Sequence, residues 1–185
     1  MSRQFFSETM VWATADGTAI ANTTTETIIF PNTTFPANYM ADGRLLRLTA
    51  FGRHSTTATP TLTFRLRWGG VGGTVLAASG AITTGSTVTA GMWMVYLLIQ
   101  TRANGSSGTL FVTGYAEVGD DAASTVGSAT NVHGRDFMGS AGVATPAAVT
   151  VDLTADTALA LSATWSAASA SNTLTGHNLV IESLN

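Results

Sequence analysis

Cysteine is absent from the 185-residue sequence, and lysine is absent too, since all eight basic residues are arginine. Without cysteine the chain has no thiol nucleophile, no thiolate metal site and no disulfide bond. Arginine suits interfaces because it pairs bidentately and is weakly hydrated. A GC-rich coding sequence would favour arginine as well. We prefer that second explanation, because nothing in the chemistry of arginine requires lysine to be missing.

Charge of either sign is scarce. Charged residues make up 10% of the chain, against roughly 25% in ordinary soluble domains. Hydrophobic residues make up a normal 45% of the chain. The share that charged residues usually have is filled by Thr, Ser, Ala and Gly, which predicts a neutral, hydroxyl-rich surface. The net charge is −3, whereas nucleic-acid-binding domains usually carry a basic face. We therefore expect no nucleic-acid partner.

Long hydrophobic runs are also missing. The longest extends from Met92 to Ile99, which is far too short to cross a bilayer. The first residues, Met1 to Glu8, lack the apolar core of a signal peptide. We expect a protein made in a cytoplasm, with no membrane partner.

The dominant positive signal is strict alternation between apolar and polar residues from Thr61 to Trp68. Leu62, Phe64 and Leu66 alternate with Thr63, Arg65 and Arg67, which is typical of a strand with one buried face and one wet face. Further strands are predicted over residues 25–30, 45–53, 74–82, 92–102, 109–118, 149–153, 157–165 and 174–184. About nine or ten short strands, with no helical period, predict an all-β, antiparallel β-sandwich.

One domain over residues 18–185 accounts for this strand inventory, preceded by an N-terminal segment or arm over residues 1–17. Residues 119–148 are rich in Gly, Ala and Ser and are predicted as one long loop; loops of that length are usually functional or mobile. Residues 92–102 carry large side chains on both faces. They predict a central strand covered on both sides, by the protein's own loops or by a neighbouring subunit.

Catalytic, cofactor and metal sites are not predicted. The histidines His54, His133 and His177 stand in unrelated contexts, and no Gly-x-Ser-x-Gly elbow accompanies them. Most acidic residues fall at strand ends or turns, where Asp is a turn former. A calcium site in the loop would have Asp120, Asp121, His133 and Asp136 as ligands. Their spacing matches no known metal loop. We expect a protein that binds and packs and is not an enzyme.

Two groups of residues are candidates for an interface. The first lies near the N-terminus, where large apolar side chains must be buried somewhere; it comprises Phe5, Phe6, Met10 and Trp12. Either this segment is the first strand of the protein's own sandwich, or it is an arm that docks on a neighbour. The second is Arg65 and Arg67, with Arg47 alongside, which form either a solvated row on one sheet face or a contact for an acidic partner.

Two segments carry a resemblance to a family. Residues 61–70, continued by residues 73–77, and residues 165–175, which lead into the last strand, resemble the jelly-roll structural proteins of tailed bacteriophages. The likeness spans about residues 25–185 and consists of strand and turn patterns. It implies a jelly roll, a homo-oligomer (often a homotrimer), a place on the virion, and the major capsid protein as partner. The implied function is a capsid decoration or cement protein on the outer head surface.

The alternative function is a tail-associated module that binds a receptor or a carbohydrate. Jelly rolls often bind sugars through exposed aromatic side chains, and the candidates are Trp12, Trp93 and Trp165. The strand patterns place Trp93 and Trp165 in the core, which counts against this alternative.

Overall fold

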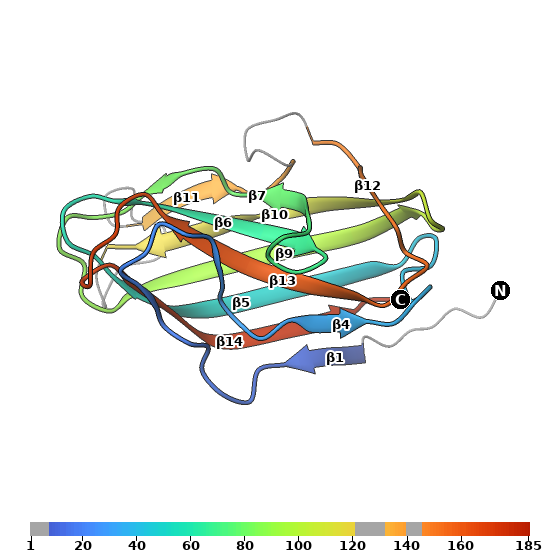
Figure 1. Cartoon of the computed structure of the whole chain (residues 1–185), viewed down its shortest axis with the longest axis horizontal. Coiled ribbons are helices and arrows are strands. Elements are labelled where there is room, and N and C mark those ends of the chain that lie inside the picture. The colour runs from blue at the N-terminus through green and yellow to red at the C-terminus, as the bar shows by residue number, and fades with distance from the viewer. Residues whose placement is uncertain (1–7, 121–131, 140–145) are drawn as a thin grey trace.

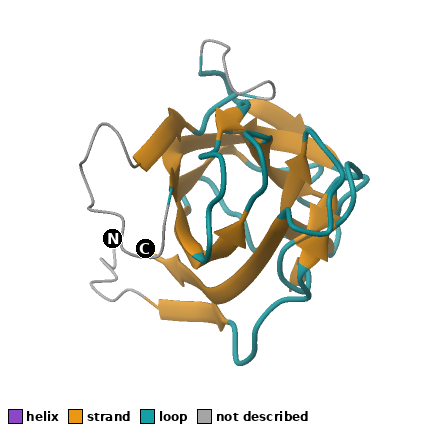
Figure 2. Cartoon of the chain, turned by 90° about the vertical axis from the view of Figure 1, so that its left-hand side faces the viewer, coloured by secondary structure: helices purple, strands orange, loops and turns teal. Residues whose placement is uncertain are grey.

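The computed structural model describes residues 8–120, 132–139 and 146–185. Two antiparallel sheets pack face to face over these residues and form a β-sandwich (Figure 1). Figure 2 looks along the sandwich from one end and shows the strands enclosing the interior. The predicted all-β sandwich is confirmed. No helix in the described part of the chain is long and apolar enough to cross a membrane.

The larger sheet has eight strands, in the order β1-β14-β5-β9-β10-β11, with β2 beside β14 and β12 beside β10. In chain order they are β1 (Glu8–Trp12), β2 (Ile20–Ala21), β5 (Leu45–Ser55), β9 (Gly91–Ala103), β10 (Gly108–Gly119), β11 (Val132–Asp136), β12 (Val149–Val151) and β14 (Thr173–Ser183).

The smaller sheet has six strands, in the order β3-β13-β6-β7, with β4 beside β13 and β8 beside β6. In chain order they are β3 (Thr27–Ile28), β4 (Thr33–Phe35), β6 (Thr61–Trp68), β7 (Thr74–Ala78), β8 (Ile82–Thr83) and β13 (Thr157–Trp165).

The core lies between the sheets and follows from the period of two. On β6 every second side chain is buried, from Leu62 to Trp68. On β9 the buried set begins with Gly91 and Trp93 and alternates with partly exposed neighbours. The rings of Trp93 and Phe64 meet across the sandwich with centroids 5.3 Å apart. Pleat geometry alone therefore selects which half of each strand is buried.

The described residues hold fourteen strands rather than nine or ten. The additional ones are short, and the predicted strand over residues 74–82 is two strands, because the chain turns at Gly80 with φ of 68°. Residues 119–148 are not one loop. β10 continues to Gly119, and β11 pairs with it in register from Gly119↔Val132 to Tyr115↔Asp136. The remainder of the predicted loop, residues 121–131 and 140–145, lies outside the described residues.

β9 occupies the predicted central position, between β5 and β10. Within the described residues, its second face is only partly covered. Met92, Met94, Tyr96 and Leu98 point away from the core and are partly exposed, and the neighbouring Tyr115 is 39% exposed. Further cover from a neighbouring subunit stays a prediction.

Candidate binding site

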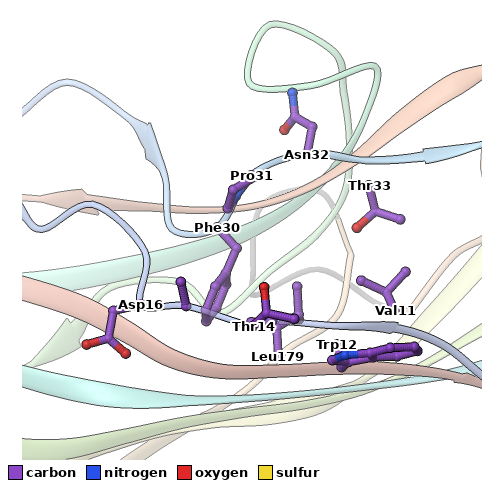
Figure 3. A pocket seen from close by; sticks show the side chains of 11 residues that line it. Val11, Trp12, Thr14, Asp16, Phe30, Pro31, Asn32, Thr33 and Leu179 are labelled. Atoms are coloured by element: carbon purple, nitrogen blue, oxygen red, sulfur yellow. The ribbon is translucent and has the colours of Figure 1, made fainter.

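A pocket of about 270 Å³ opens at the edge of the sandwich, between β1 with the segment after it and the turn that leads into β4 (Figure 3). One wall is formed by Val11, Trp12, Ala13, Thr14, Ala15 and Asp16, the other by Phe30, Pro31, Asn32 and Thr33, with Leu179 beneath. The lining thus combines an apolar base with polar groups at the rim, which is the usual make-up of a small-molecule site.

Backbone contacts fix the first wall. β1 pairs antiparallel with β14, with Trp12 opposite Val180. Beyond β1 the chain stays attached to β14, since the Ala13 amide donates to the Leu179 carbonyl over 2.9 Å. Gly17 ends the wall by lying directly against Ile29. A Cβ at this position would be 2.0 Å from the Ile29 oxygen, so only glycine lets the two segments approach.

Trp12 is the unusual side chain of this wall, because 60% of it is exposed. The other three tryptophans are buried: Trp68 is 7% exposed, and Trp93 and Trp165 are 0% and 1% exposed, as their strand patterns predict. In the view of Figure 3, the Trp12 ring and Asp16 lie at opposite ends of the pocket, with Phe30 between them. A large exposed indole beside a concave surface offers a flat apolar face to a ligand.

Polar groups surround this apolar surface. Asp16 lies 2.9 Å from His177, measured from Oδ1 to Nδ1, and both side chains remain well exposed. Thr14 and Asn32 are also exposed, on opposite walls. Residues 12–16 span at most about 14 Å when extended, so Trp12 and Asp16 are placed to contact different parts of one extended ligand. Hydroxyl, amide and carboxylate groups together offer both donors and acceptors.

The sequence did not reveal Asp16, Asn32 or Thr33 as site residues. Nothing in their local context distinguishes them, because the pocket forms only when residues 11–16 meet residues 30–33. Trp12 was identified by its type and position alone. Of the other N-terminal candidates, Met10 lies in β1 and accepts a hydrogen bond at Sδ from the Tyr39 hydroxyl over 3.0 Å. Residues 8–12 are therefore an edge strand of the protein's own sheet, while Phe5 and Phe6 lie outside the described residues.

Arg65 and Arg67 share one face of the smaller sheet, as predicted, but both are engaged within the chain. The Arg67 guanidinium donates to both oxygens of Glu26, with Nε–Oε1 of 2.6 Å and Nη2–Oε2 of 2.7 Å. Arg65 Nη1 lies 3.5 Å from Glu26 Oε2. Arg47 does not join this row, because it lies in the larger sheet and pairs with Glu182 over 2.8 Å.

The Glu26 carboxylate is half-buried at the centre of this network. Burial by itself raises its pKa. Hydrogen bonds from Arg67 and from the Ser162 hydroxyl, at 2.5 Å, together with the charges of Arg67 and Arg65, outweigh burial and hold the pKa below its ordinary value. The network is a satisfied structural feature. An interface role for Arg65 and Arg67 stays a prediction.

Two of the four residues named as calcium ligands lie side by side. His133 Nε2 is 3.0 Å from Asp120 Oδ2. Asp136 is exposed on β11, and Asp121 lies outside the described residues. Among the described residues, no group of three or more acidic or histidine side chains is arranged to hold a metal ion.

His54 is buried close to this pair, 1% exposed and packed on the Trp165 ring. Burial lowers the pKa of His54 to about 4, against opposing effects of the Gly91 backbone and the Asp120 carboxylate. The imidazole is therefore neutral at physiological pH. A neutral, enclosed ring of this kind contributes packing. In acid, its protonation favours the unfolded state and lowers the stability of the fold.

Comparison with known proteins finds no matching family model and no matching curated protein. Among solved structures, the chain is similar to the CBM2 module of the Lactobacillus casei BL23 phage J-1 evolved Dit. The two share 10% sequence identity with a TM-score of 0.30, over 82% of this chain and 67% of the other. The likeness is weak, and a TM-score of 0.30 is too low to transfer any function.

Proposed function

We propose that this protein is a non-catalytic, carbohydrate-binding β-sandwich module, with its binding site at the pocket between β1 and residues 30–33. The observation that carries the proposal is Trp12, whose exposed indole stands at the rim of a pocket with polar walls. A sugar ring has an apolar face that packs on an indole, and its hydroxyl groups need donors and acceptors around it.

The polar rim supports a neutral or hydroxyl-rich ligand rather than an anion. Among the described residues that line the pocket, Asp16 is the acid and none is basic. An anionic ligand would meet an unfavourable charge at Asp16, whereas a hydroxyl group donates readily to a carboxylate. From the resemblance to phage structural proteins we infer a place for such a module on a virion, where a glycan on the host surface would be its target.

The test is a glycan array followed by calorimetry on each glycan bound. We expect Trp12→Ala to weaken binding at least about tenfold, which corresponds to ~1.4 kcal/mol. Trp12→Tyr should restore part of the affinity, because a smaller aromatic face remains. Val71→Ala is the matched control, since Val71 is an exposed apolar side chain outside the pocket. Binding that survives Trp12→Ala unchanged would refute the site.

A capsid decoration or cement protein is the second candidate. The observation that favours it is the partly exposed apolar face of the larger sheet, because such faces are common at protein interfaces. Its proposed partner, the major capsid protein, and its proposed trimeric state come from the resemblance. Counting copies per particle in purified virions tests this function, since a decoration protein covers the shell and a receptor-binding module occurs in few copies.

A further inference from the structure

The outer face of the larger sheet carries a continuous apolar ridge along its central strand. Met92, Met94, Tyr96 and Leu98 alternate along β9 and all point away from the core. In the next strand Tyr115 pairs with Tyr96, and their rings stack with centroids 5.7 Å apart. On the opposite flank Phe51 of β5 pairs with Met94 and is also partly exposed. A monomer with a solvated face would carry polar residues at these positions.

We infer that this face binds a second copy of the same chain, sheet against sheet, around a twofold axis that runs along β9. This inference is independent of the proposed carbohydrate site. A twofold contact places the same surface on both partners, so the ridge of β9 would meet its own copy. Aligned sheet packing at about −30° and a separation of about 10 Å is a common arrangement for two such faces.

Charge complementarity supports the second copy as the occupant. β5 and β10 flank β9 on opposite sides, and a twofold axis along β9 sets β5 of one copy over β10 of the other. Arg53 is exposed on β5 opposite Met92, and Glu117 lies on β10 opposite Met94. The rotation therefore brings Arg53 of each copy toward Glu117 of the other. Elsewhere on this sheet, Arg47 already pairs with Glu182 of the same chain.

The area is also sufficient. Five neighbouring strands, from β14 to β11, hold 11, 11, 13, 12 and 5 residues, together 52. With about 3.3 Å per residue and about 4.8 Å between strands, they cover roughly 800 Å². A standard interface buries about 800 Å² per partner. β1 lies three strands from β9, whereas the sheet extends only two strands beyond β9 on the other side. Trp12 is therefore outside the footprint, and the pocket stays open in the dimer.

The first experiment measures the mass of the full chain by sedimentation over a range of concentrations. We expect a dimer for the natural chain and a monomer for Met94→Glu, which buries a charge at the centre of the contact. The dimer dissociation constant should rise about tenfold or more. Thr63→Glu is the matched control on the outer face of the smaller sheet and should leave the dimer intact. Circular dichroism confirms that each variant is folded.

A charge swap tests the geometry separately. Arg53→Glu and Glu117→Arg should each weaken the dimer, and the double variant should restore it. The inference would be overturned if the natural chain is monomeric at about 0.1 mM. It would also be overturned if an oligomer of any order persists in Met94→Glu. A double variant no better than the single ones would overturn it as well. Glycan binding by Met94→Glu would be unaffected, so that failure of this inference and failure of the carbohydrate proposal are separable.

Discussion

The two outer faces of the sandwich arise from the same alternation and have opposite chemistry. On the smaller sheet, Arg65 and Arg67 alternate with core residues, and both guanidinium groups contact the Glu26 carboxylate of the same sheet face. On the larger sheet, the corresponding positions of β9 hold Met94 and Tyr96, which remain partly exposed. One face completes its interactions within the chain. The other face would gain stability if a partner buried its apolar side chains. This difference distinguishes a structural surface from a binding surface.

The same contrast bears on the interpretation of arginine. The row of arginines on one strand left open a solvated face or a contact for an acidic partner, and a carboxylate that meets it belongs to this chain. Glu26 lies about forty residues earlier in the sequence and reaches β6 only because β3 and β6 both pair with β13. Charged residues on a strand therefore say little about partners until the neighbouring strands are known.

The largest predicted effect is a loss of folding stability in acid. It arises from the buried His54 and not from the Glu26 face. The pKa of His54 falls from 6.5 in the unfolded chain to about 4 in the folded one. The unfolded state therefore binds the proton more tightly, and stability is lost as pH falls from about 6.5 to 4, by about 3 kcal/mol. Urea unfolding, followed by tryptophan fluorescence across this range, measures the loss.

His54→Phe should flatten that dependence, while His177→Gln, at an exposed histidine, should leave it unchanged. The Glu26 face titrates in a separate window. Because the pKa of Glu26 is lowered in the folded state, its contribution is complete above about 4.5 and is lost only as pH falls below that value. A slope between pH 6.5 and 4.5 that survives His54→Phe would contradict the assignment.

The second prediction concerns the paired face directly. Glu26→Gln leaves Arg67 half-buried without its carboxylate, and the free energy of unfolding should fall by about 2 kcal/mol. Glu182→Gln is the matched control, because it breaks the Arg47 pair on the larger sheet, where the arginine side chain is 36% exposed. Exposed pairs contribute about 0–1 kcal/mol. Equal losses from the two variants, measured by urea unfolding, would remove the distinction between the faces.

The smallest predicted effect is on the unpaired face. Met94→Thr, measured in dilute solution where the chain is monomeric, should change the free energy of unfolding by less than about 1 kcal/mol, because Met94 is partly exposed on the outer face of β9. Val95→Thr, one residue away and 0% exposed, should cost about 1–3 kcal/mol, since it buries a hydroxyl group. If Met94→Thr costs as much as Val95→Thr, the outer face of β9 is part of the folded core.

The candidate site was predictable only in part. Trp12 could be selected because a tryptophan close to a chain end needs an explanation, and the burial of Trp93 and Trp165 followed from their strands. Asp16 and Asn32 gave no signal, since each is an ordinary turn residue until the two segments meet. The approach of Gly17 to Ile29, which joins those segments, is a contact across the fold that no local pattern encodes.

The sequence by itself determined that the chain forms sheets, and it determined which half of each strand faces the core. Both follow from the local geometry of the pleat, in which neighbouring side chains point to opposite sides. Only the tertiary structure decided which strands are neighbours. For that reason it alone could pair Glu26 with Arg67, set Trp12 across from Asn32, and leave the ridge of Met94 and Tyr96 partly exposed.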